Sequence, residues 1–131
     1  MTDHWALSYV GKPWTPQQDC FYWFRYWSRT FFGHDLPDSG VCHERLLATA
    51  SRIMAGDIER AFGYRLTETP QEGDAVFLSQ RTRPHHIGMV VLPDEQFYVL
   101  HALEGAGVIA STVTDLALNG WKIKGYWTYA G

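Results

Sequence analysis

The chain has 131 residues, of which 46% are hydrophobic and 19% are charged, and its formal net charge is −3. This length fits one domain spanning residues 1–131, and the composition excludes a disordered or fibrous protein. The slight acidic excess, without a run of Lys or Arg, gives no electrostatic reason to expect nucleic-acid binding. No apolar stretch approaches the roughly 18 residues of a membrane span, and the first residues lack the apolar segment of a signal peptide. We therefore expect neither membrane insertion nor a secretory signal.

Aromatic residues make up 15% of the chain, and eight of them lie in the segment FYWFRYWSRTFF, residues 21–32. Asp19 suits the N-cap or the first turn of a helix and Gly33 suits its end, so we predict a helix that begins near Asp19 and stops at Gly33, after a loop at residues 9–18. Steps of three and four residues give this helix one apolar face, formed by Cys20, Trp23, Phe24, Trp27 and Phe31. Tyr22 and Tyr26 fall off this face and are candidates for a partner or substrate surface.

The rest of the chain predicts further helix and then strands. We expect a second helix at residues 41–55 and a short one at 57–62. Apolar runs bounded by turn residues predict five strands, at residues 75–78, 87–92, 97–103, 108–111 and 121–129, with one helical turn at 114–118. Alternation in the last strand predicts one shared face for Trp121, Ile123, Trp127 and Tyr129. Helices separated from an antiparallel sheet indicate an α+β fold.

Cys20 stands at the expected start of the first helix. At such a position the helix dipole and free backbone N–H groups lower the pKa of a thiol, and the same groups can hold an oxyanion. Free cysteine is also among the residue types most often buried, so position alone favours a small core side chain. A disulfide between Cys20 and Cys42 is the less favoured alternative in a chain without a leader.

Two histidines lie on neighbouring predicted strands, His86 at the start of one and His101 within the next. Adjacent antiparallel strands can place both imidazoles side by side, so that His86 acts as base toward Cys20 and His101 orients the ring. The alternative is an edge histidine and a core histidine bonded to backbone, and the residues alone leave the two interpretations balanced.

The remaining histidines and the second cysteine suggest no site of their own. His85 would point to the opposite strand face from His86, and His4 and His34 are expected at the surface. Cys42 and His43 are adjacent and lack the spacing of zinc ligands, so we expect no metal.

Short motifs in a fixed order resemble the NlpC-type cysteine peptidases, which are papain-like. They start with the loop YVGKPW at residues 9–14 followed by Asp19-Cys20, and the segment GHDLP at 33–37 is similar to the phage-tail branch of the family. The motifs PQEGDAV, HIGMVV, LHA, GV and IKGY follow at residues 70–76, 86–91, 100–102, 107–108 and 123–126. The chain departs from the family in lacking a Gly-Gly pair before Asp19 and in carrying bulky residues at 21–23.

The resemblance implies a papain-like fold, with N-terminal helices packed on an antiparallel sheet of about five strands. It implies Cys20 as nucleophile, His86 as base and His101 as the orienting residue, with no cofactor. Substrate contacts would come from residues near the nucleophile: Trp14, Asp19 and Tyr9.

The implied activity is hydrolysis of the peptide stem of peptidoglycan. The expected setting is a phage tail, whose proteins would be partners, assembled in the host cytoplasm and carried to the cell wall by the virion. A structural tail-assembly protein without turnover and a related thiol amidase or acyltransferase remain as alternatives.

Overall fold

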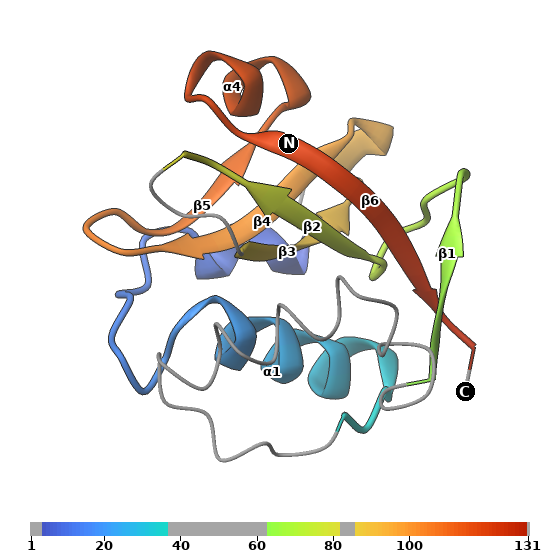
Figure 1. Cartoon of the computed structure of the whole chain (residues 1–131). Coiled ribbons are helices and arrows are strands. Elements are labelled where there is room, and N and C mark those ends of the chain that lie inside the picture. The colour runs from blue at the N-terminus through green and yellow to red at the C-terminus, as the bar shows by residue number, and fades with distance from the viewer. Residues whose placement is uncertain (1–3, 37–62, 82–85, 131) are drawn as a thin grey trace.

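A computed structural model describes residues 4–36, 63–81 and 86–130 (Figure 1). The predicted helices at residues 41–55 and 57–62, together with Cys42, His43 and His85, lie outside these described residues. The described part is an α+β structure, as predicted, in which one antiparallel sheet has six strands. In chain order its elements are η1 (Trp5–Tyr9), α1 (Cys20–Phe32), β1 (Tyr64–Thr67), β2 (Ala75–Ser79), β3 (His86–Val91), η3 (Pro93–Glu95), β4 (Tyr98–Leu103), β5 (Gly107–Ser111), α4 (Val113–Leu118) and β6 (Lys122–Tyr129).

The strands lie in the order β1-β6-β2-β3-β4-β5, and every neighbouring pair is antiparallel. The expectation of about five strands was one too few because β1 had not been predicted. This strand is the four residues YRLT, in which only Tyr64 is buried and Leu66 is 60% exposed. Such a short edge strand carries no apolar run from which its sequence could be recognised.

Helix α1 has the predicted position because both of its ends are capped. The Asp19 carboxylate accepts a hydrogen bond from the Tyr22 N–H at 3.0 Å, and Gly33 ends the helix with φ at 68°, a left-handed conformation that favours glycine. The buried face comprises Cys20, Phe21, Trp23, Phe24, Trp27 and Ser28. Phe31, predicted on this face, is instead 37% exposed, and its ring stacks on that of Trp5 with centroids 4.1 Å apart.

The sheet has a hydrophobic core on each face, because successive strand residues point to opposite sides. One core contains the buried residues of α1, which packs against β3 and β4 (Figure 1). The other contains Leu116 from α4, on the opposite side of the sheet in this view, together with Val76, Leu78, Val90, Val99 and Trp121. The sheet therefore stands between α1 and α4.

A β-bulge divides β6 between the two cores. Phe77 pairs with Gly125, but the next residue, Leu78, pairs with Ile123, so β6 carries one extra residue at this point. An extra residue reverses the alternation of side chains beyond it. Trp121 and Ile123 consequently pack in the core between the sheet and α4, whereas Trp127 and Tyr129 pack against the core between the sheet and α1. The prediction that these four side chains share one face was wrong.

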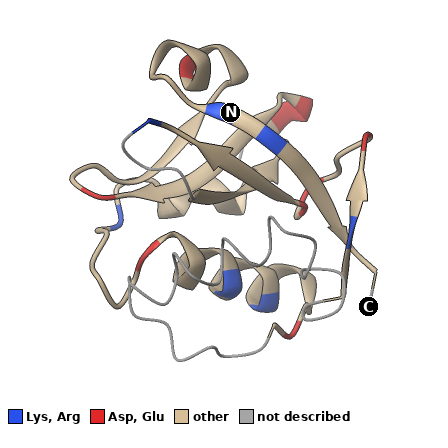
Figure 2. Ribbon diagram, in the orientation of Figure 1, with Lys and Arg blue, Asp and Glu red and all other residues tan. Residues whose placement is uncertain are grey.

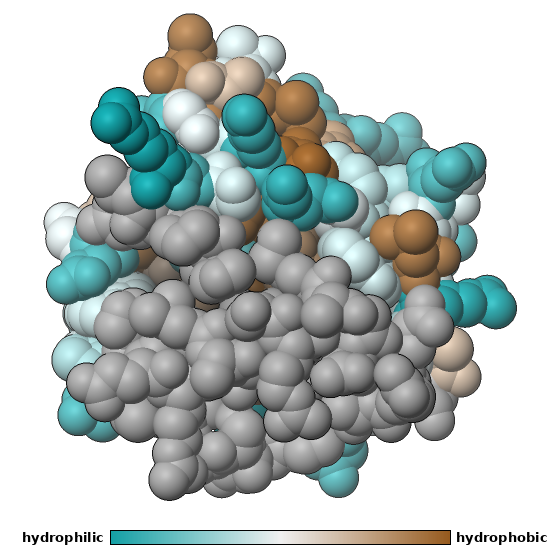
Figure 3. Space-filling view, in the orientation of Figure 1, coloured by the Kyte–Doolittle hydropathy of each residue, from teal (hydrophilic) through white to brown (hydrophobic). Residues whose placement is uncertain are grey.

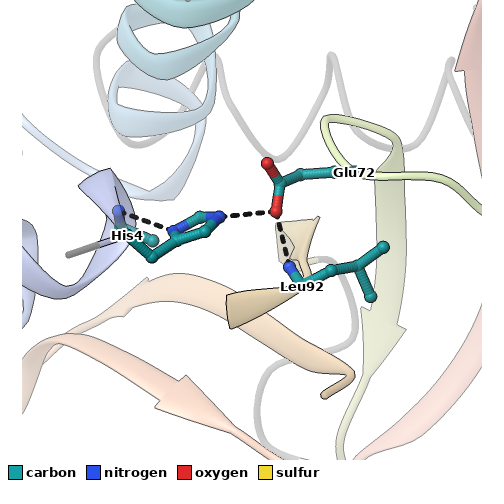
Figure 4. A network of polar contacts seen from close by, with 4 residues as sticks. His4, Glu72 and Leu92 are labelled. Atoms are coloured by element: carbon teal, nitrogen blue, oxygen red, sulfur yellow. Dashed lines mark hydrogen bonds and ion pairs between the residues drawn. The ribbon is translucent and has the colours of Figure 1, made fainter. Parts of the chain in front are cut away.

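A polar network ties the start of the chain to the sheet (Figure 4). The His4 Nδ1 accepts a hydrogen bond from the Ala6 N–H, so its Nε2 carries the proton and donates to Glu72 at 2.6 Å. The same Glu72 oxygen accepts from the Leu92 N–H at 2.7 Å. His4 and His34 were expected at the surface, but both are partly buried, and His34 stacks on Tyr129 with ring centroids 4.0 Å apart.

The described surface is mixed in polarity. Lysine, arginine, aspartate and glutamate are scattered over the ribbon in Figure 2, without a broad patch of one sign in this view. Apolar side chains reach the surface in several places, among them Leu118 at 80% exposure and Val113 at 48%. Figure 3 shows such hydrophobic groups between hydrophilic ones in the upper part of the molecule. Within residues 4–36, 63–81 and 86–130, no helix has the length and apolar character needed to cross a bilayer.

Candidate active site

The two histidines on neighbouring strands lie side by side. His86 is the first residue of β3, and its Nε2 lies 2.8 Å from Nδ1 of His101 in β4. The rings are 5.0 Å apart between centroids and nearly perpendicular at 75°. Gly88 makes this close approach possible, since a Cβ there would lie 2.6 Å from Val99 Cγ1 and 3.1 Å from His101 Cβ.

Two further residues complete this cluster, and sequence reasoning assigned neither of them to it. The Ser111 hydroxyl lies 3.0 Å from His101 Nε2, and the Trp121 indole stacks on the His86 ring with centroids 4.8 Å apart at 26°. A signal for Ser111 was present in the sequence, because the turn at residues 104–106 predicts that β4 pairs with β5. In this pairing His101 lies opposite Ile109, and Ser111 is two residues further along β5, on the same face of the sheet. Trp121 carried no such signal, since the bulge in β6 decides which face it takes.

Burial keeps His101 uncharged. Its side chain is 1% exposed, and this desolvation lowers its pKa to about 4. At neutral pH the ring therefore holds a single N–H, and one of its nitrogens must act as hydrogen-bond acceptor.

Cys20 is the first residue of α1, and its thiol is in contact with the start of β3. The Ile87 N–H donates a hydrogen bond to the sulfur, and the backbone N–H groups of Cys20 and Phe21 also stabilise negative charge there. Burial outweighs them and, together with the negative charge of Asp19, raises the pKa of Cys20 to about 12. Of the two alternatives left by the sequence, the structure agrees with the small buried side chain and not with a lowered pKa, since Cys20 is 4% exposed and desolvation dominates.

The cysteine and the histidine pair meet at the beginning of β3. Ile87, whose amide contacts the thiol, directly follows His86 along the strand. The two side chains belong to different cores, since Ile87 packs with Cys20 beneath α1 while His86 stacks on Trp121. The Cys20 thiol therefore contacts the backbone of β3 one residue after His86.

Two hollows lie on either side of the turn between β4 and β5. One, of about 280 Å³, is lined by His101 and Ser111 together with Gln80, Leu103, Asn119 and Trp121. The other, of about 310 Å³, is lined by Gly11, Pro13 and Trp14 of the loop before α1 and by residues 105–107 of the turn. Ala106 lines both, so this turn separates a hollow beside the histidine pair from one beside the loop that precedes α1.

The three expected substrate contacts differ in their surroundings. Trp14 borders the second hollow, on a loop held to β5 by hydrogen bonds of Gly11 and Lys12 with Val108. Asp19 is fully buried as the N-cap of α1, which argues against the predicted direct contact with substrate. Tyr9 packs edge-on against Trp23 and Trp27, and burial, with a hydrogen bond to Tyr26, raises its pKa to about 12. Its ring therefore lies over the middle of α1 rather than beside Cys20.

Neither possible metal ligands nor similar proteins assign a further role to the residues of this site. Among the described residues, no three His, Cys, Asp or Glu side chains are grouped so that they could hold a metal ion. Comparison of the chain with protein-family models, with curated proteins and with solved structures finds no match.

Proposed function

We propose that this chain is a papain-like cysteine peptidase of the NlpC type that hydrolyses the peptide stem of peptidoglycan as part of a phage tail. The observation that carries the proposal is the buried hydrogen bond between His86 and His101. His86 begins β3, and the amide of the next residue, Ile87, contacts the Cys20 thiol. A cysteine nucleophile, a histidine base and a third group that orients the histidine are the catalytic residues of a thiol peptidase.

The position of each motif supports this proposal. Asp19 and Cys20 begin the helix that packs on the sheet, His86 begins β3, and His101 lies in the adjacent β4. Trp14 borders a hollow on the loop before the helix, where the family resemblance expects a substrate-lining aromatic. The resemblance thus connects residues that are far apart in sequence and near one another in the fold.

The chemistry begins with a neutral thiol, because the raised pKa of Cys20 keeps it protonated at pH 7. His86 accepts the thiol proton as the sulfur attacks the carbonyl carbon, and backbone N–H groups at the start of α1 stabilise the oxyanion. The tetrahedral intermediate expels the amine, which takes the proton from His86. Water, deprotonated by His86, then attacks the thioester, releasing a carboxylate and restoring the thiol.

A structural tail-assembly protein is the second candidate, and the buried thiol with its raised pKa favours it. The pH dependence of alkylation tests how this thiol behaves. We expect iodoacetamide to modify Cys20 far more slowly at pH 7 than it modifies the unfolded chain, with a rate that still rises above pH 9. Peptide mapping would separate Cys20 from Cys42, and a plateau near pH 8.5 in the folded protein would contradict the pKa assigned to Cys20.

Substitutions separate the peptidase from the structural protein. We expect Cys20→Ala and His86→Ala to lower cleavage of purified wall fragments by at least about a thousandfold, because each removes a reacting group. His101→Ala removes orientation alone and should cost roughly 10- to 100-fold. Cys42→Ala is the matched control, and circular dichroism would verify that each variant is folded. Equal cleavage by the Cys20→Ala protein would refute the proposal.

A thiol amidase or acyltransferase would use the same three side chains, so these variants would not distinguish it. The acceptor of the acyl group distinguishes an acyltransferase, because hydrolysis by water leaves a new carboxylate whereas a transferase joins the acyl group to an amine. An amidase also uses water, and it is distinguished by which bond of the wall fragment is cut. The masses of the products identify both the acceptor and the bond.

A further inference from the structure

Three buried side chains form a hydrogen-bonded row across adjacent strands of the sheet. His86 in β3 bonds His101 in β4 at 2.8 Å, and His101 bonds Ser111 in β5 at 3.0 Å. Their exposed fractions are 5%, 1% and 7%, in that order, so solvent competes little for these bonds. Ser111 is the last member of the row and lies on the edge strand.

The protons in this row can be arranged in two directions. His101 is neutral and has one N–H, so it donates through one ring nitrogen and accepts through the other. In one direction His86 donates to His101 and His101 donates to Ser111. In the other direction Ser111 donates to His101 and His101 donates to His86. A serine hydroxyl can take part in either, because it is both donor and acceptor.

We propose that Ser111 is a positioning residue that accepts the Nε2–H of His101 and thereby fixes the protons of both histidines. The hydroxyl borders the hollow of about 280 Å³, so its own hydrogen can point to water there while its oxygen accepts. His101 must then accept at Nδ1, and the hydrogen in the bond to His86 belongs to His86 Nε2.

The consequence for the proposed reaction is a lone pair on His86 Nδ1. A neutral His86 that carries its hydrogen on Nε2 can receive the thiol proton at Nδ1, whereas the reverse arrangement would occupy Nδ1 with a hydrogen. Ser111 thus acts on the base through His101 and without contact with substrate. This consequence rests on the proposed peptidase function, but the proton positions do not.

Nitrogen-15 NMR of the histidine rings measures the proton positions directly in the substrate-free protein. In the wild type we expect one tautomer for each ring, with hydrogen on Nε2 of both His86 and His101. Ser111→Ala should turn this single pattern into a mixture at both rings, and Ser111→Thr, which keeps the hydroxyl, should restore it. Ser8→Ala, at an exposed serine bonded to the Trp5 carbonyl, is the matched control.

Activity gives a second readout if the wild type cleaves wall fragments. Ser111→Ala should lower kcat about tenfold, with KM unchanged and an altered pH profile, and Ser111→Thr should recover most of the loss. A wild-type His101 with its hydrogen on Nδ1, or an unchanged tautomer pattern in Ser111→Ala, would overturn the inference. The wild-type spectrum alone decides the first point even if Ser111→Ala does not fold. An inactive wild type with the expected tautomers would refute the peptidase and leave the role of Ser111 standing.

Discussion

His101 illustrates how a single side chain can link the fold to pH. The sheet buries this imidazole in its neutral form, which lowers its pKa from 6.5 to about 4. Between these two values the unfolded chain binds a proton that the folded chain excludes. The free energy of unfolding therefore rises with pH in this range, and the stabilisation is lost as the pH falls from 6.5 towards 4.

We expect acidification from pH 7 to pH 4 to cost about 3 kcal/mol of stability through His101 alone, given its shift from 6.5 to about 4. Urea unfolding across this range, compared between the wild type and His101→Gln, would measure the difference in slope. His34→Gln is a useful control, because burial also lowers the pKa of His34, which is more exposed. Parallel curves for the wild type and His101→Gln would contradict the account.

At the scale of residues, features that depend on neighbours in the sequence could be predicted, and the effect of burial on a side chain could not. The start of α1 near Asp19 and its end at Gly33 were correctly predicted, because a cap depends on neighbours within a few residues, and Asp19 takes the N-cap of the two positions that its sequence allowed. For Cys20 the sequence left a lowered pKa and a buried core side chain as alternatives, and the desolvation that decides between them comes from side chains distant in sequence. Ser111 was missed as a partner of His101 although both lie on one predicted hairpin, because their contact depends on the exact register of its two strands.

At the scale of elements, Gly88 determines how closely β3 and β4 approach at the histidine pair. We expect Gly88→Ala to destabilise the protein by about 1–3 kcal/mol, because its methyl group would overlap Val99 Cγ1 and crowd His101 Cβ. The nitrogen-15 signals of His86 and His101 should shift as well. Chemical unfolding and the same NMR spectra would measure both effects.

The variant Val99→Ala provides the control for this clash. Removing Val99 Cγ1 makes room for the new methyl group, so the double variant should lose less stability than the two single variants added together. Strictly additive losses would show that the Val99 contact is not the cause.

Elements with a strong period were predictable, and those defined by pairing were not. The strands β2 to β5 fall close to their apolar runs, and α1 to its aromatic face. The edge strand β1 depends on pairing with β6, and the bulge in β6 appears only when its register with β2 is known. Without that bulge, the alternation assigns Trp121 to the wrong face.

At the scale of the whole molecule, the aromatic excess of the sequence builds the core that holds α1. Trp23, Phe24 and Trp27 are at most 7% exposed and pack with Cys20 between the helix and the sheet. The segment that looked unusual in composition therefore fixes the candidate nucleophile against the start of β3. The same packing leaves Cys20 only 4% exposed, so this core favours precise placement of the thiol and opposes its ionisation.

The arrangement of the sheet decides which groups can act together. Its order places β3, β4 and β5 side by side, so His86, His101 and Ser111 form one row although the first and last are 25 residues apart in the chain. Cys20, the first residue of α1, contacts the backbone amide of Ile87, the residue that follows His86. These four residues are the machinery on which the proposed function depends.

Mass spectrometry of wall fragments digested by the wild type and by Cys20→Ala tests the proposed function most directly. We predict that the wild type produces pairs of stem-peptide products whose masses together equal the substrate plus one water, as hydrolysis requires. The Cys20→Ala protein, shown to be folded, should leave the fragments intact, while Cys42→Ala should match the wild type. The same products from Cys20→Ala, or none from the wild type, would contradict the account.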